Sequence, residues 1–149
     1  MLLGLAAATP TCVALSAELV FTCARRKGLF LRPGAAGLRV RRAQRAIERQ
    51  IPWLSSFAAV ASVGLALSAG LMTRAGCLAL GALLALGAHL TFYSQGARRF
   101  WDDTTGLERL SASGIDLAAL KARWEVEMTT RASLHAAALV CIVASMMLR

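Results

Sequence analysis

The sequence is short of charge and lacks several motifs from which function is often inferred. Asparagine is absent, which excludes N-linked glycosylation, and charged residues make up only 17% of the chain. Soluble domains average about 25% charged residues. The sequence contains no glycine-rich phosphate loop, no nucleophile elbow and no HExxH metal motif. Because hydrophobic residues reach 57%, the composition does not suit an ordinary soluble domain.

The four cysteines also lack the spacing of a functional site. They form no CxxC pair and no zinc-finger pattern, and each lies inside an apolar stretch. We therefore expect them to act as small packing residues. They are Cys12, Cys23, Cys77 and Cys141.

The positive charge of the chain is concentrated in one segment. The formal net charge is +9, and nine of the 17 Lys and Arg residues lie between Arg25 and Arg49. A basic protein raises the hypothesis of nucleic-acid binding. These residues flank apolar stretches, however, where retention of positive charge on the cytoplasmic side explains them. We expect anionic lipid headgroups, and no nucleic acid, as the partner of this segment.

Four apolar stretches are each long enough to cross a bilayer as a helix. The first has 23 residues, which rise by about 34 Å as an α-helix, whereas the hydrocarbon core is about 30 Å thick. The sequence therefore predicts a single all-α domain over 1–149. It would be an integral membrane four-helix bundle with an amphipathic cytoplasmic extension before the last span. The predicted spans are about 2–24, 51–72, 75–96 and 132–148.

The loops differ sharply in their content of Lys and Arg. The two long loops, 25–50 and 97–131, contain nearly all of these residues, whereas the hairpin between the second and third spans has only Arg74. The positive-inside rule places both long loops in the cytoplasm. The sequence thus predicts a multi-pass protein of the plasma or inner membrane with both termini extracytoplasmic.

Small residues recur every fourth position on the two middle spans and predict close helix packing. Before the second span, a helical pattern from Leu38 predicts an interfacial helix that runs into the span. Trp53 then suits an aromatic anchor at the membrane surface. The two predicted packing ladders are Ala58, Ser62, Ala66 and Gly70, and Cys77, Gly81, Ala85 and His89.

Several polar side chains lie within the spans, where they are costly unless they are paired. With alternating span directions, all of them fall in the cytoplasmic half of the bundle. One interpretation is a polar pocket in which Glu18 and His89 form an acid–base pair. The other is a hydrogen-bonded cluster that only fixes helix packing. The candidate catalytic residues are Glu18, His89 and His135, and the candidate binding residues are Tyr93, Trp124 and Arg131.

One Glu and two His also match the ligand types of non-haem iron enzymes. The three residues come from three different spans and show no spacing signature. We therefore predict no metal site and no cofactor from the sequence.

Three segments together resemble a known family. They run from Ala43 to Phe57, from Thr91 to Asp102 and from Trp124 to Arg131. In order and spacing they resemble the small four-span membrane proteins grouped with the anthrone oxygenases, and the resemblance covers roughly residues 10–148.

The chain departs from this family at two positions. Gln95 stands where the family commonly has Asn after the third span. Met128 stands where the family has Asn or His between the Trp and the Arg. A Met side chain cannot act as a base. The family pattern is therefore matched here at Trp124 and Arg131.

The resemblance implies a cofactor-independent oxygenase of a polycyclic aromatic, anthrone-type substrate, with His89 or His135 as the base. Two alternatives remain open. In the first, the chain is a membrane protein with a structural or accessory role and no catalysis. In the second, it is a small proton-coupled transporter that uses Glu18. Membrane lipid and a hydrophobic aromatic small molecule are the expected partners. The sequence contains no indication of oligomeric state.

Overall fold

The structure is a computed structural model, and it confirms the all-α prediction. It describes residues 1–26, 35–105 and 117–148, with the side chains at 25–26, 35–38, 40–41, 96–105, 117–121 and 123–124 outside that description. The described residues form helices and turns, without strands. The helices are α1 (Leu2–Arg26), α2 (Ala35–Glu48), α3 (Ile51–Ala69), α4 (Arg74–Thr105) and α6 (Leu117–Met147).

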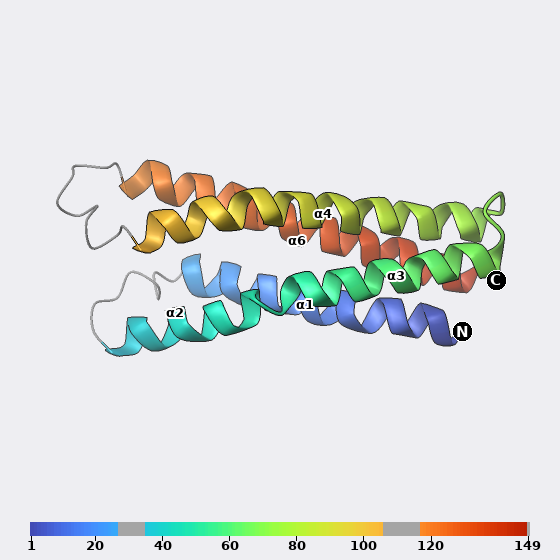
Figure 1. Cartoon of the computed structure of the whole chain (residues 1–149), viewed down its shortest axis with the longest axis horizontal. Coiled ribbons are helices and arrows are strands. Elements are labelled where there is room, and N and C mark those ends of the chain that lie inside the picture. The colour runs from blue at the N-terminus through green and yellow to red at the C-terminus, as the bar shows by residue number, and fades with distance from the viewer. Residues whose placement is uncertain (27–34, 106–116, 149) are drawn as a thin grey trace.

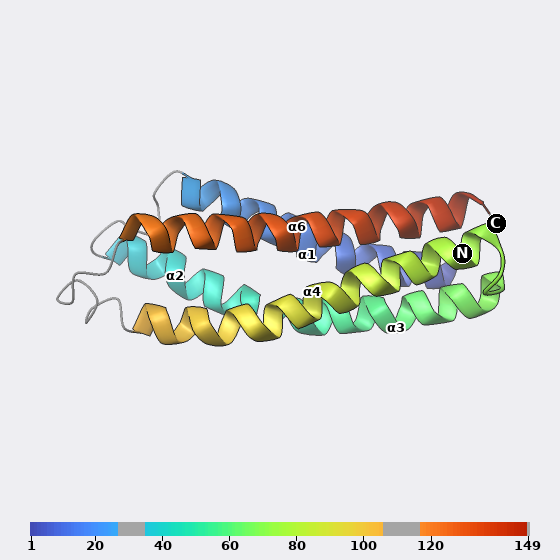
Figure 2. The same cartoon turned by 90° about the horizontal axis from the view of Figure 1, so that it is seen from above.

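The long helices form an antiparallel bundle in which the chain runs alternately up and down (Figures 1 and 2). α1 packs against α3 and α6, and α4 packs against the same two helices. Each of the four therefore has two antiparallel neighbours. Both termini and the α3–α4 turn lie at one end, and α2 extends α3 at the other (Figure 1). We call this other end the arginine-rich end, because α2 contributes Arg39, Arg42 and Arg45 to it.

Four helical segments of the described chain are long and apolar enough to cross a membrane. This confirms the prediction of a four-span bundle. The second segment starts earlier than predicted, because it includes the helical run from Arg42 that precedes the apolar stretch. The four segments are Leu2–Ala24, Arg42–Ala69, Arg74–Gln95 and Glu125–Met147.

Each long helix buries one narrow seam, and most seam residues on α1, α3 and α4 are small. Along each seam the spacing alternates between three and four residues, as in coiled coils and four-helix bundles. Such small side chains let the helix backbones approach closely, which favours packing inside a membrane. The buried seams run through Ala7, Thr11, Ala14, Glu18 and Phe21 on α1; Ile51, Ser55, Ala58, Ser62 and Leu65 on α3; Ala75, Ala79, Ala82, Leu86 and His89 on α4; and Met128, Arg131, His135, Ala138, Ile142 and Ser145 on α6.

The ladder predicted on the second span is buried at Ala58, Ser62 and Ala66. The ladder predicted on the third span was wrong at its first member, because Cys77 is exposed. A strict four-residue repeat drifts around the helix, whereas the seam repeats every 3.5 residues. The ladder therefore joins the buried face only at His89, and Gly81 and Ala85 lie at its edge.

The turn between α3 and α4 lies a few residues earlier than predicted. α3 ends at Ala69, and Gly70 adopts a positive φ of 86°, which favours glycine. The hydroxyl oxygen of Thr73 then accepts a hydrogen bond from the amide of Gly76 at 3.0 Å, which caps α4. A Cβ atom at Gly76 would overlap the carbonyl oxygen of Gly70. The hairpin therefore depends on glycine at two positions.

Two other boundaries differ from the sequence prediction. Residues 97–105 were assigned to a loop, but the backbone of α4 continues through them to Thr105. The interfacial helix that was expected to run into the second span does so with an interruption at Arg49 and Gln50. Pro52 follows directly as the second residue of α3, where its missing N–H removes a helical hydrogen bond.

Candidate functional site

One layer of the bundle consists of four polar side chains. It is built from one seam residue of each long helix, and all four side chains are completely buried. The next seam positions toward the termini are apolar and also fully buried: Ala14, Ala58, Leu86 and Ala138. The polar residues are Glu18 of α1, Ser55 of α3, His89 of α4 and His135 of α6, and we call them the polar ring.

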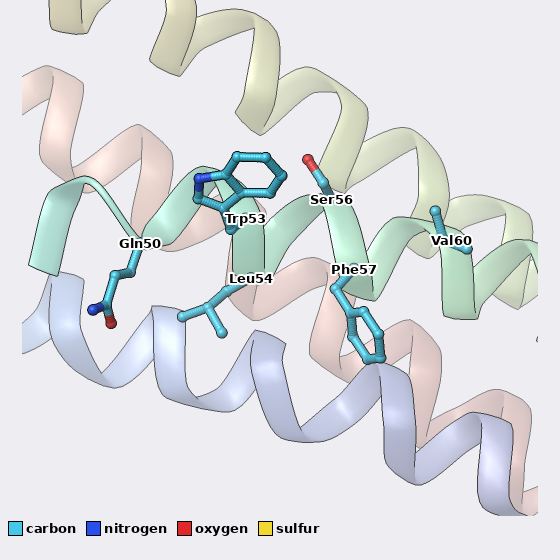
Figure 3. Close-up of a pocket in the computed structure, with 6 residues that line it drawn as sticks. All are labelled: Gln50, Trp53, Leu54, Ser56, Phe57 and Val60. Atoms are coloured by element: carbon cyan, nitrogen blue, oxygen red, sulfur yellow. The ribbon is translucent and has the colours of Figure 1, made fainter.

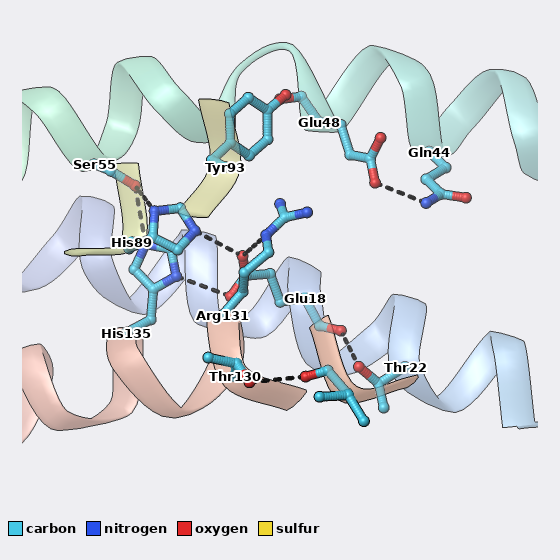
Figure 4. A network of polar contacts seen from close by, with 11 residues as sticks. Glu18, Thr22, Gln44, Glu48, Ser55, His89, Tyr93, Thr130, Arg131 and His135 are labelled. Atoms are coloured by element: carbon cyan, nitrogen blue, oxygen red, sulfur yellow. Dashed lines mark hydrogen bonds and ion pairs between the residues drawn. The ribbon is translucent and has the colours of Figure 1, made fainter. Parts of the chain in front are cut away.

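The four side chains contact one another in a closed circuit (Figure 4). Glu18 Oε1 lies 3.1 Å from His89 Nε2, and Glu18 Oε2 lies 2.8 Å from His135 Nδ1. On the opposite side, Ser55 Oγ lies 2.9 Å from His135 Nε2 and 3.4 Å from His89 Nδ1. The imidazole centroids are 3.9 Å apart with the planes tilted by 47°. Both nitrogens of each imidazole are therefore engaged.

With Glu18 ionised and both imidazoles neutral, the circuit has four contacts but only three hydrogens to fill them. An ionised carboxylate only accepts, each neutral imidazole carries one N–H, and a serine hydroxyl donates once. The two N–H groups must point at Glu18, so Ser55 can donate to only one remaining nitrogen. The shorter distance assigns that bond to His135, and the 3.4 Å contact with His89 is left without a hydrogen. One added proton would complete the circuit.

Arg131 lies beside the ring on the side of the arginine-rich end. Its Nε is 3.3 Å from Glu18 Oε1, and the residue is only 2% exposed. The guanidinium carbon lies 4.8 Å from the centroid of the Tyr93 ring, a cation–π geometry. Nε and Nη2 have no hydrogen-bond partner among the described residues. Arg131 thus neutralises Glu18 while keeping donors unused within the part of the chain that the structure describes.

Tyr93 connects this site to the break between α2 and α3. Its hydroxyl donates to the backbone carbonyl of Glu48 at 2.7 Å (Figure 4). In a regular helix that carbonyl would accept from the amide four residues later. That position is Pro52, which has no N–H. Tyr93 therefore supplies a hydrogen bond that proline cannot. The Glu48 side chain is buried and accepts from Gln44 Nε2 at 2.7 Å.

The structure brings five of the six candidate residues together. Glu18, His89 and His135 are in direct contact, and Tyr93 and Arg131 adjoin them. The side chain of Trp124, the sixth candidate, lies outside the described residues.

Sequence reasoning missed Ser55, because serine is common in membrane helices and marks no site by itself. The seam spacing of Ile51, Ser55 and Ala58 would have placed it in the interior. Met128, where the resembling family has Asn or His, is buried on α6 one turn before Arg131.

The ring offers three donor atoms of the kinds that bind transition metals. One atom each from Glu18, His89 and His135 lie within 4.8 Å of one another. The set matches a two-histidine, one-carboxylate site. Arg131, however, already places a positive charge 3.3 Å from that carboxylate. A divalent cation would be repelled by the guanidinium in a medium of low dielectric constant. The guanidinium therefore disfavours binding of a metal ion at these three atoms.

The fold and the buried polar ring define a multi-pass α-helical membrane protein. Beyond that class, the comparisons identify no relative: no known protein family, no curated protein and no solved structure matches the chain.

Proposed function

We propose that this protein is a membrane-embedded acid–base enzyme whose polar ring takes one proton from a lipophilic substrate. The observation that carries the proposal is the circuit of four contacts with three hydrogens. Such a circuit has a defined place for one more proton, at His89 Nδ1. Histidine is the side chain best suited to proton transfer near neutral pH.

A gain in stability is a weak explanation for the presence of polar side chains in this layer. Buried ion pairs are often no more stabilising than apolar residues of similar size, and polar groups inside membranes are typically functional. The apolar layer beside the ring, which consists of Ala14, Ala58, Leu86 and Ala138, could have continued through this position. The presence of four polar side chains from four helices therefore supports a chemical role.

Arg131 supports a particular class of substrate. Its Nη2 is buried without a hydrogen-bond partner among the described residues, whereas Nε faces the Glu18 carboxylate. A donor placed in this way stabilises an oxyanion as it forms. A carbon acid conjugated with a carbonyl yields such an oxyanion, an enolate, when it loses its proton to the ring. The anthrone-type substrate implied by the family resemblance is an acid of this kind.

For such a substrate the overall reaction with dioxygen is balanced without a further co-reactant. The CH2 group opposite the carbonyl becomes a second carbonyl. One oxygen atom of O2 enters this new carbonyl, and the other leaves as water with the two hydrogens of the CH2 group. The part assigned to this chain is removal of the first proton and stabilisation of the enolate. We further propose that the arginine-rich end faces the cytoplasm and both termini face outward, because Lys and Arg are retained inside.

The experiment is turnover of anthrone by the protein in nanodiscs, followed by oxygen uptake and by anthraquinone absorbance above the rate without protein. His89→Gln and His135→Gln are expected to lower the rate by about 10²-fold or more, since general-base catalysis contributes 10²–10⁴-fold. Ser62→Ala is the matched control, because Ser62 is buried on the same helix as Ser55 but donates to its own helix at Ala58. A wild-type rate equal to autoxidation, or full activity of both folded histidine variants, would contradict the proposal.

A further inference from the structure

A groove lies along α3 and is lined by side chains of that helix and of Gln50 (Figure 3). It has a volume of about 650 Å³. Its large apolar side chains are strongly exposed, with Trp53 at 79%, Phe57 at 62% and Val60 at 72%. The full lining is Gln50, Trp53, Leu54, Ser56, Phe57 and Val60. These residues lie inside the candidate span Arg42–Ala69, so the groove faces the membrane.

Polarity changes steadily along this face. Arg42 and Arg49 are exposed on the segment that precedes the groove, and Gln50 lies at one end of its lining (Figure 3). The indole of Trp53 comes next, at the level where aromatic residues favour the headgroup boundary. Phe57 and Val60 follow, without a charged residue. The order of cation, amide, indole and apolar side chains is complementary to the order of phosphate, glycerol ester and acyl chain in one phospholipid.

The length of the groove fits one leaflet. From Gln50 to Val60 the helix rises by about 15 Å, which is about half of a 30 Å hydrocarbon core. A chain lying in the groove would thus start at the arginine-rich end and reach the middle of the bilayer.

We propose that this groove is a binding site for one anionic phospholipid. An acyl chain lies against Trp53, Phe57 and Val60, and the phosphate lies at Arg49 and Gln50. The charge of the segment selects an anionic over a zwitterionic headgroup. Glu48, the acidic residue next to Arg49, is 3% exposed and its carboxylate accepts from Gln44, so its charge is turned away from the groove. The site is independent of the acid–base function.

Trp53 provides a direct reporter of occupancy. The protein is reconstituted in phosphatidylcholine vesicles that contain a small fraction of lipid brominated on its acyl chains. Bromine quenches tryptophan fluorescence on contact, and the difference between wild type and Trp53→Phe isolates the signal of Trp53. We expect brominated phosphatidylglycerol to quench Trp53 several-fold more effectively than brominated phosphatidylcholine at equal mole fraction.

Two variants test the assignment of the phosphate. Arg49→Gln is expected to lower the preference for phosphatidylglycerol by about fivefold, the effect of one basic residue near an anionic surface. Arg74→Gln removes an exposed arginine at the other end of the bundle and should leave the preference unchanged. Equal quenching by the two lipids in the wild-type protein would overturn the proposal. An unchanged preference in Arg49→Gln would overturn the placement of the phosphate.

Discussion

Tyr93 on α4 donates its hydroxyl hydrogen to the backbone carbonyl of Glu48, at 2.7 Å and 45 residues away in the chain. The bond exists because Pro52 cannot donate to that carbonyl. The same phenol ring lies under the guanidinium of Arg131. One side chain therefore joins the break between α2 and α3 to the charged edge of the polar ring.

Tyr93→Phe should lower the free energy of unfolding by about 1–3 kcal/mol, because it leaves a partly buried carbonyl without this donor but keeps the aromatic ring under Arg131. Denaturation in detergent micelles, followed by circular dichroism, would measure the loss. Pro52→Ala restores an amide four residues after Glu48. The cost of Tyr93→Phe should therefore shrink in the Pro52→Ala background, and equal costs in both backgrounds would refute the relationship.

Glu18→Leu should be among the most destabilising substitutions in the chain. It leaves Arg131 buried without its carboxylate, and breaking a buried ion pair typically costs about 3–5 kcal/mol. The double variant Glu18→Leu/Arg131→Leu removes both charges and should recover much of the lost stability. The same unfolding assay measures the coupling energy. Additive losses in the double variant would show that the 3.3 Å pair is not energetically coupled.

The two ring histidines should occupy opposite tautomers. Contact with Glu18 requires the hydrogen of His135 on Nδ1 and that of His89 on Nε2. Nitrogen-15 NMR of the side chains in detergent would distinguish these states. Ser55→Ala should change the signals of both histidines, whereas Ser62→Ala, on the same helix, should change neither. A hydrogen on Nε2 of His135 at neutral pH would contradict the hydrogen bonds assigned to the polar ring.

The direction of insertion can be measured with two exposed positions at opposite ends of the bundle. Single cysteines are introduced at Arg39 and Arg74 after the four native cysteines are replaced by alanine. In intact cells a membrane-impermeant maleimide should label position 74 and not position 39. Labelling of both positions from one side would exclude the four-span topology, and the reverse pattern would place the arginine-rich end outside.

Hydrophobicity and charge along the sequence were sufficient to predict four spans, because span length depends only on local composition and bilayer thickness. Alternating direction was enough to place Glu18, His89 and His135 at one depth. The rotation of each helix about its axis depends on its neighbours, and only the tertiary structure decided it. In the structure, Ser55 lies between the two imidazoles and Cys77 is exposed. Tyr93 donates to the backbone carbonyl of Glu48, to which Pro52 cannot donate. Each of these features depends on contacts between residues far apart in the chain, and a local sequence pattern does not determine the energies of such contacts.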